Sequence, residues 1–284
     1  MVTDLGTRTD VTESGSGPPV LLVHGQPGLA EDWNAVVELA RRDHRVIVPD
    51  RPGYGAASGE PTSMAENARM LAELMIERDA VPATVVGHSY GGGIALLLAA
   101  QRPDLVTGLV LVGSVGPASG LGAIDHLLAN RVVGEAMSAA GLIILGRILP
   151  RLRPAARMVP GLPGEWLSAV LPDGRYAAVT DGRTGSEMSL LRAFVREQRA
   201  MLEEISTVEE QAARISVPTV VVAGSWDVVV PPSTASWLAS NIDRAELVIV
   251  DHAGHFIPRD RPDVVVEALS RVEDTGPPGE AAYR

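Results

Sequence analysis

Residues 83–101 read ATVVGHSYGGGIALLLAAQ, and three local patterns follow one another within them. Residues 83–87 form a short apolar run that ends in glycine, as a buried strand does. Residues 90–101 are apolar on almost every side of a helix, which is expected of a helix buried against a sheet. Ser89 lies between the two runs. The pattern predicts a strand, a tight turn that carries Ser89, and a buried helix.

The motif Gly-x-Ser-x-Gly at residues 87–91 occurs once in the chain, and it is weak by itself because 29 of the 284 residues are glycine. Its position between a strand and a buried helix strengthens it. A sharp turn there would hold Ser89 in a strained backbone conformation, and side chains in place of the two glycines would collide with neighbouring backbone. We therefore predict that Ser89 is a nucleophile. The alternative is a serine that caps a core helix.

Apolar strand-like runs alternate with helical patterns on both sides of this motif. Further helices are expected near residues 29–41, 64–78 and 262–271. Further strands are expected at residues 19–23, 45–49, 108–112, 218–223 and 246–250. Such alternation, with uniformly apolar strands, predicts an α/β fold with a mostly parallel central sheet and helices on both faces.

The alternation is interrupted once, in residues 117–214, where no convincing strand is found. Helical patterns at residues 121–149 and 186–214 flank a proline-rich stretch. We expect a helical cap rather than a structureless insertion, because unstructured loops of this length are rare in compact domains. The predicted division is a core domain, residues 1–116 and 215–284, with residues 117–214 inserted as the cap.

A second motif, His24-Gly25-Gln26-Pro27-Gly28, follows the first apolar strand. With the turn at Ser89, it resembles the α/β-hydrolase superfamily, in particular the capped serine-hydrolase branch whose members carry His-Gly-x-Pro here. The resemblance covers nearly the whole chain, although the cap matches only in position. It implies an α/β-hydrolase fold in which Ser89 lies on the nucleophile elbow. Epoxide hydrolases and haloalkane dehalogenases carry aspartate at the elbow, so Ser89 argues against both activities.

Acyl transfer through a tetrahedral intermediate needs two fixed donors for the developing oxyanion. The family takes one from the residue after the nucleophile, here the backbone N–H of Tyr90, at the start of a helix. The other comes from the loop after the early strand, where the N–H of Gln26 is the candidate by position. Gly25 and Pro27 restrict the backbone there, although an ordinary turn is the alternative. His24 is expected to be a buried residue that supports the loop.

Ser89 also needs a general base, and His255 is the best candidate among the six histidines. It ends the segment Asp251-His252-Ala253-Gly254-His255, on a loop at the carboxyl edge of the sheet, where such folds gather their sites. Its Gly-His pair matches the family's. His252 is the rival, but it lies closer to the strand and would more readily pack as a structural residue.

The remaining histidines are weaker candidates for the base. His88 adjoins Ser89, but neighbouring side chains on the elbow are expected to diverge. His44 lies at a helix-to-strand connection on the opposite edge of the sheet, and His126 lies in the cap.

The imidazole needs an acceptor on its other nitrogen, and Asp227 is the candidate. Asp227 follows the strand that ends at Ala223, and with Pro231 it resembles the family's Gly-x-x-Asp-x-x-x-Pro. The chain order Ser, Asp, His is the order of this fold. A turn aspartate without catalytic duty is the alternative. Asp50 is interpreted as a structural residue of the turn Asp-x-Pro-Gly-x-Gly.

Composition and charge exclude several classes of function. The net charge of −11 argues against binding nucleic acid through the overall field, because phosphates need a positive surface. The chain has no cysteine, so disulfides, thiolate chemistry and cysteine-ligated metals are excluded. Residues 1–19 lack the order of a secretory signal, so a cytoplasmic location is expected. The uncharged run at residues 105–124 is interpreted as a strand and loop, not a membrane span.

The cap composition bears on the substrate. The cap is rich in Leu, Ile, Val, Ala and Met, which favours an apolar acyl or alcohol pocket as much as simple packing of the cap onto the core. Four cap arginines favour a solvated basic face over capture of a substrate carboxylate or phosphate: Arg147, Arg151, Arg153 and Arg157.

The sequence therefore predicts a carboxylesterase-like serine hydrolase that cleaves a carboxylic ester or related acyl compound through an acyl-enzyme on Ser89. It needs no metal or organic cofactor, its partner is a small apolar substrate, and its oligomeric state is left open. The alternatives are C–C bond hydrolysis of diketones, lactone or amide hydrolysis, and cofactor-free haloperoxidase (perhydrolase) chemistry. C–C hydrolases carry asparagine where this chain has His88, which argues against that activity. Proline iminopeptidases carry tryptophan where this chain has Tyr90, which argues against that one. A noncatalytic ligand-binding homologue is the alternative from another class.

Overall fold

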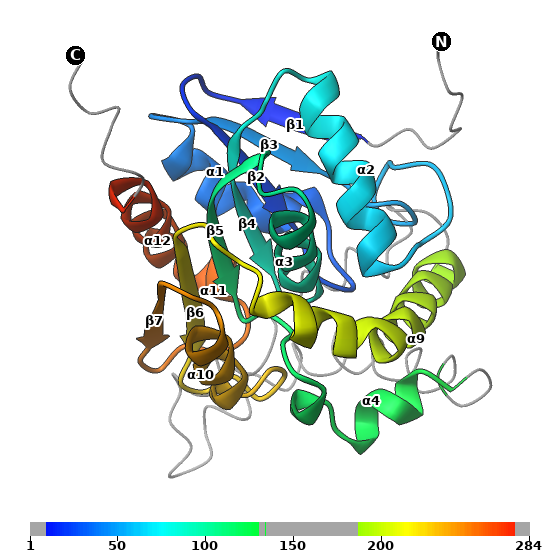
Figure 1. Cartoon of the computed structure of the whole chain (residues 1–284). Helices are drawn as coiled ribbons and strands as arrows, with labels where there is room; N and C mark the ends of the chain where they lie inside the picture. The colour runs from blue at the N-terminus through cyan, green and yellow to red at the C-terminus, as the bar shows by residue number, and fades with distance from the viewer. Residues whose placement is uncertain (1–9, 131–133, 135–186, 276–284) are drawn as a thin grey trace, which may run out of the picture.

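The computed structural model describes residues 10–130, 134 and 187–275. Within them the strands form one seven-stranded sheet in the order β1-β3-β2-β4-β5-β6-β7 (Figure 1). The strands are β1 (Val11–Ser14), β2 (Pro19–Val23), β3 (Arg45–Pro49), β4 (Ala83–His88), β5 (Val106–Val112), β6 (Thr219–Gly224) and β7 (Ala245–Val250). Only the edge pair β1 and β3 is antiparallel. The predicted α/β class with a mostly parallel sheet is confirmed.

Helices cover both faces of the sheet, because alternate residues of each buried strand point to opposite sides. In β2, Leu21 and Val23 pack with one cluster of core residues, and Val20 and Leu22 pack with the other. The first cluster includes residues of α2 (Met64–Glu77), α3 (Tyr90–Gln101) and α10 (Pro232–Asn241). The second includes residues of α1 (Asn34–Ala40), α11 (Ile257–Asp260) and α12 (Pro262–Asp274). A 3-10 turn, η1 (Ala30–Trp33), leads into α1.

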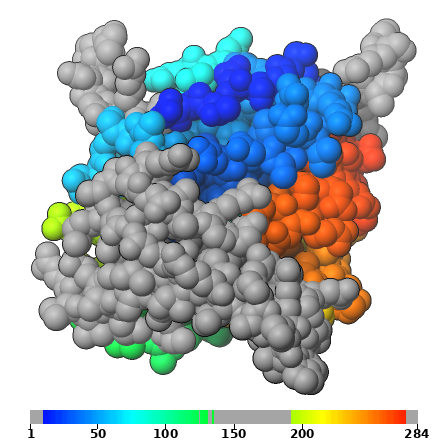
Figure 2. All heavy atoms as spheres, turned by 180° about the vertical axis from the view of Figure 1, so that it is seen from behind, coloured from blue at the N-terminus to red at the C-terminus, as the bar shows by residue number. Residues whose placement is uncertain are grey.

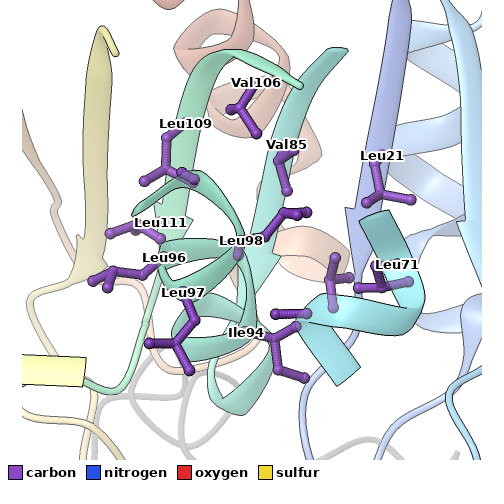
Figure 3. Packing of buried hydrophobic residues seen from close by; sticks show 14 of the residues in the cluster. Leu21, Leu71, Val85, Ile94, Leu96, Leu97, Leu98, Val106, Leu109 and Leu111 are labelled. Carbon is purple, nitrogen blue, oxygen red and sulfur yellow. The ribbon is translucent and has the colours of Figure 1, made fainter. Parts of the chain in front are cut away.

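Helix α3 is buried on all sides, as the apolar pattern after Ser89 predicts. Figure 3 shows its side chains against both neighbouring strands and against α2: Ile94, Leu96, Leu97 and Leu98 with Val85, Leu109, Leu111 and Leu71. A helix packed this tightly fixes the position of its own N-terminus. The turn at Ser89 is therefore anchored by the centre of the core.

The predicted insertion is described only at its two ends. The chain leaves β5 through a 3-10 turn, η2 (Ala118–Gly120), and α4 (Ala123–Leu128), and it returns through the long helix α9 (Glu187–Ala212). Residues of the second half of α9 belong to the core cluster beside α3. The proline-rich stretch and the four cap arginines lie outside the described residues, so the cap remains a prediction. None of the helices described is long and apolar enough to span a membrane.

Differences from the sequence-based expectation occur mostly at the periphery. The predicted bounds of β2, β3 and α3 match the structure. Strand β1 was not expected, because its residues are polar and it is held by its ladder to β3. Helix α10 was also missed. Strand β7 was expected to be buried, but as the edge strand it exposes Glu246, Leu247 and Ile249.

Candidate active site

The turn at Ser89 has the strained backbone that the motif predicts. Ser89 adopts φ 55° and ψ −122°, a positive φ that side chains other than glycine rarely take, and its N–H donates to the Val112 carbonyl at 3.0 Å. A Cβ on Gly87 would lie 2.4 Å from the carbonyl oxygen of Gly91, and one on Gly91 would lie 2.3 Å from that of Val23. Both glycines are therefore required for the chain to turn here.

The carboxyl ends of neighbouring strands bring the loops of the site together. The N–H of Gly113 donates to the carbonyl of Val222 at 2.8 Å, which ties the end of β5 to β6. The N–H of Ser225 donates to the carbonyl of Val250 at 2.9 Å, which ties the end of β6 to β7. The loops that carry Ser89, Asp227 and His255 therefore leave the same edge of the sheet, as parallel topology requires.

Asp227 and His255 form the hydrogen bond that the sequence predicts. Asp227 Oδ2 accepts from His255 Nδ1 at 2.8 Å, with the aspartate side chain fully buried and the histidine side chain 6% exposed. The other carboxylate oxygen accepts the N–H groups of Val229 at 2.9 Å and Val230 at 2.8 Å. This arrangement fixes the orientation of the carboxylate. It also assigns the Nδ1 proton to the aspartate bond, so Nε2 is the nitrogen that can take a proton.

His88 contacts His255, which was not anticipated from the sequence. As the last residue of β4, it places its ring 4.8 Å from the His255 ring, and its Nε2 lies 2.9 Å from the His255 carbonyl oxygen. Burial, and then the charge of His255, lower the pKa of His88 to about 3. A neutral ring donates its Nε2 proton to that carbonyl, so His88 fixes the backbone of His255 beside the elbow.

The loop with the predicted oxyanion donor packs against Ser89. A Cβ on Gly25 would lie 3.0 Å from the Ser89 Cβ, so the loop approaches the serine as closely as glycine permits. Tyr90 is the first residue of α3, and its N–H therefore has no acceptor within the helix. Among the residues that the structure describes, the N–H of Gln26 donates to no backbone carbonyl. Both predicted donor amides thus lie on segments that meet at Ser89.

A buried ion pair adjoins this loop, and sequence reasoning missed it. Arg51 and Glu197 both have side chains without solvent exposure, and the guanidinium donates to both carboxylate oxygens. The hydroxyl of Tyr54 donates to Glu197 Oε2 at 2.6 Å. One signal was available in the sequence: Glu197 lies four residues after Ala193 and four before Met201, on the apolar stripe of its helix.

The other polar candidates have structural roles. His24 is fully buried and its Nε2 accepts the N–H of Arg51 at 3.0 Å, so it supports the loop as expected; burial, and then the Arg51 charge, hold its pKa well below the usual value. Asp50 accepts the N–H of Ala30 at 2.8 Å, in keeping with a structural turn residue. His252 packs against another side chain, but at the surface: it is exposed and stacks on Trp226 at 4.6 Å between ring centroids.

Two further histidines lie away from the elbow. His44 pairs with Glu273 at 2.9 Å on the opposite edge of the sheet, as its position predicted, and His126 is exposed on α4. In the described part of the chain, no three His, Asp or Glu side chains are grouped so that they could hold a metal ion.

Comparison with known proteins identifies the family. Residues 20–268 match the model of the alpha/beta hydrolase family. A protein of Mycobacterium tuberculosis, itself uncharacterised, is 31% identical, over 97% of this chain and 81% of the relative. The 2-hydroxy-6-oxo-6-(2'-aminophenyl)hexa-2,4-dienoic acid hydrolase of Metapseudomonas resinovorans is 28% identical, over 95% of this chain and 90% of that enzyme. A thermophilic esterase from Thermogutta terrifontis superposes with a TM-score of 0.71 at 25% identity, over 94% of this chain and 93% of the esterase.

The chain belongs to the α/β-hydrolase family, and the activity class that its relatives support is hydrolysis.

Proposed function

We propose that the protein is a serine hydrolase that cleaves carboxylic esters or related acyl compounds through a covalent acyl-Ser89 intermediate. The observation that carries this proposal is the hydrogen bond between Asp227 and His255. Ser89 lies on a strained turn, and the residue before it, His88, contacts His255. A buried carboxylate that is bonded to a histidine beside such a serine is the arrangement that activates a hydroxyl for nucleophilic attack.

In the first half-reaction, His255 Nε2 takes the hydroxyl proton as Ser89 Oγ attacks the acyl carbon. Asp227 stabilises the imidazolium that forms, because its carboxylate is already bonded to Nδ1. The backbone N–H groups of Gln26 and Tyr90 receive the negative oxygen of the tetrahedral intermediate. His255 then protonates the leaving alcohol, and the intermediate collapses to the acyl-enzyme.

In the second half-reaction, His255 removes a proton from water, which attacks the acyl carbon and releases the acid. The proton on His255 returns to Ser89 Oγ, so the enzyme is regenerated unchanged. Every proton transfer in the cycle uses the same imidazole nitrogen.

Replacement of Ser89 tests the proposal. Ser89→Ala should lower kcat for a p-nitrophenyl ester by about 10⁵–10⁶, because the nucleophile is lost while substrate binding remains. The matched control is Ser114→Ala, another buried serine at the carboxyl edge, which should keep wild-type activity. Circular dichroism should show that both variants are folded. Retained esterase activity in folded Ser89→Ala would refute the proposal.

A second candidate is hydrolysis of a 2-hydroxy-6-oxo-dienoic acid, the class named in the Metapseudomonas resinovorans relative. The same serine, histidine and aspartate can serve that reaction. The two candidates separate in a direct comparison of kcat/KM for p-nitrophenyl esters and for such a dienoate. We expect the ester to be preferred; a preference of 100-fold or more for the dienoate, about 3 kcal/mol in barrier, would replace the first candidate by the second.

A further inference from the structure

The guanidinium of Arg51 holds the backbone of the loop that carries the predicted oxyanion donor. Its Nε donates to the His24 carbonyl at 3.2 Å, and its Nη2 donates to the Gly25 carbonyl at 2.8 Å. The N–H of Arg51 also donates to the His24 ring at 3.0 Å. One side chain thus fixes two consecutive carbonyls, which a planar, forked donor can do and a single ammonium cannot.

The direction of the Gly25 carbonyl determines the direction of the next amide. The bond between Gly25 and Gln26 is not among the cis peptides of the described chain, so the carbonyl of Gly25 and the N–H of Gln26 point in opposite directions within one rigid plane. With the carbonyl turned toward Arg51, the N–H is turned away from it. Loss of the Arg51 bond would free this plane to rotate and would misdirect the donor.

Glu197 keeps the guanidinium in place. It lies on α9, 146 residues from Arg51, and both side chains are completely buried. The rings of Tyr54 and Tyr90 lie 4.9 and 5.1 Å from the guanidinium carbon, so Arg51 is enclosed by aromatic faces as well as by the carboxylate. Burial acts to lower the pKa of Arg51, but Glu197 and Tyr54 raise it above its usual value, so the side chain stays charged.

Helix α9 also contacts the loop directly. Gln198, the residue after Glu197, accepts a hydrogen bond through its Oε1 from the side-chain Nε2 of Gln26 at 2.7 Å. Gln198 in turn donates to Asp125 of α4 at 3.0 Å, so the chain of contacts runs from the loop into both described ends of the predicted cap. The loop beside Ser89 is therefore held from the side of the insertion by two adjacent residues of one helix.

We propose that Arg51 and Glu197 are positioning residues that set the oxyanion donor of Gln26, and that α9 thereby couples the insertion to the reaction centre. The inference rests on the proposed acyl-transfer function, because it assigns the pair to that function's oxyanion hole. A buried ion pair with a purely structural role would affect stability alone. A positioning role affects the transition state as well.

The first test is Arg51→Lys, which keeps a positive charge for Glu197 but cannot reach both carbonyls. We expect a Tm within a few degrees of the wild type, an unchanged KM, and a kcat lowered about 10-fold to 100-fold, up to the loss typical of a missing oxyanion donor. The matched control is Glu204→Ala, one heptad further along α9, where the carboxylate accepts the N–H of Met64 at 2.7 Å. It should lower Tm and leave kcat unchanged.

A second measurement reports the oxyanion hole directly. Sulfur is a weaker hydrogen-bond acceptor than oxygen, so an enzyme that relies on the hole prefers a p-nitrophenyl ester to its thionoester. The ratio of kcat/KM for the two substrates should fall at least 5-fold in Arg51→Lys and stay at the wild-type value in Glu204→Ala. The double variant Arg51→Met/Glu197→Met leaves no unpaired buried charge, so its Tm should stay near that of the wild type. Its kcat and its substrate ratio should be lowered as in Arg51→Lys.

Wild-type kcat in Arg51→Lys or in the double variant would overturn the inference, as would a lower kcat with an unchanged substrate ratio. Labelling of the wild type by a fluorophosphonate probe separates this failure from failure of the proposed function. If Ser89 is labelled and the Arg51 variants are fully active, only the positioning role is wrong. If Ser89 is not labelled, the acyl-transfer proposal and the positioning role fail together.

Discussion

Charged side chains are buried at the carboxyl edge of the sheet and partly exposed at the amino edge. At the carboxyl edge, Arg51, Glu197 and Asp227 have side chains with no solvent exposure. At the amino edge, the side chains of Arg45 and Glu13 pair with 28% and 31% of their surface exposed. Figure 2 shows the face where the blue N-terminal part of the chain lies beside the orange and red C-terminal part. His44, the residue before β3, pairs with Glu273 of α12.

This difference in exposure shows that the unfavourable desolvation of charged groups is greater at the carboxyl edge. Desolvation of an ion pair usually offsets its attraction, so a buried pair adds little net stability, whereas an exposed pair is cheap to form. The buried charges lie on α9 and on loops beside the candidate site, whereas the exposed pair of Arg45 and Glu13 joins two strands at the surface. We infer that the buried charges at the carboxyl edge hold side chains in fixed positions rather than add stability. Four predictions test this difference between the two edges.

The largest effect is expected at Asp227. Asp227→Asn should lower kcat by about 10⁴-fold, because an amide favours the wrong tautomer of His255 and does not stabilise the imidazolium. The control is Asp251→Asn, at an exposed aspartate on the loop before His255, which should stay within about twofold of wild type. Steady-state kinetics with a p-nitrophenyl ester measure both. Equal activity of the two variants would remove the distinction between the buried and the exposed carboxylate.

The next effect concerns stability. Arg51→Met leaves Glu197 buried without its partner and should reduce the free energy of unfolding by about 3–5 kcal/mol. Arg45→Met breaks a partly exposed pair at the other edge and removes two hydrogen bonds to the carbonyls of Arg78 and Asp79, so it should cost about 1–2 kcal/mol. Urea denaturation of both variants gives the comparison. Similar losses would show that the two edges do not differ energetically.

The third prediction is a loss of stability in acid. The pKa of His88 is lowered from 6.5 to about 3, mainly by burial and then by His255, so the folded state binds fewer protons than the unfolded state between these values. The free energy of unfolding should therefore fall as pH drops below about 6.5, by up to ~1.4 kcal/mol per pH unit from this residue. His88→Gln should flatten that slope. If the free energy of unfolding depends on pH in the same way in the variant and in the wild type, His88 is not neutral and buried in the folded state.

The smallest effect has the opposite sign and lies at the amino edge. The hydrogen bond with Glu273 raises the pKa of His44, so this pair stabilises the fold fully below pH 6.5 and loses its contribution as pH rises through the folded-state value. Glu273→Gln should lower stability by less than about 1 kcal/mol at pH 6, because the Glu273 side chain is 35% exposed. At pH 9, urea denaturation should give similar values for variant and wild type. A deficit that grows with pH would contradict the assignment.

The centre of the fold was predictable because its patterns are local. The strand of residues 19–23 and the helix of residues 90–101 are almost wholly apolar, and proline or glycine lies at or near each of their ends, so their limits follow from the sequence. Strand β1 was not predictable, since its polar residues acquire strand geometry only through the ladder to β3. The exposed face of β7 was missed because its edge position depends on the order of all the strands.

The candidate site divides in the same way. Asp227 and His255 were predicted together from short motifs after two strands, and the structure joins them. Two other contacts were not predicted, because each joins residues more than 100 positions apart: His88 with His255, and Arg51 with Glu197. Sequence motifs identify groups that can react, whereas the residues that hold them are set by tertiary packing.

The most direct test of the central claim is the rate at which a fluorophosphonate probe labels Ser89, with peptide mapping by mass spectrometry. Labelling of the wild type should fall on Ser89 alone, and His255→Gln should slow it at least 100-fold, because the hydroxyl loses its base. His252→Gln, at the neighbouring exposed histidine, should label at the wild-type rate. No label on Ser89 in the folded wild type, or an undiminished rate in His255→Gln, would contradict an activated serine at this position.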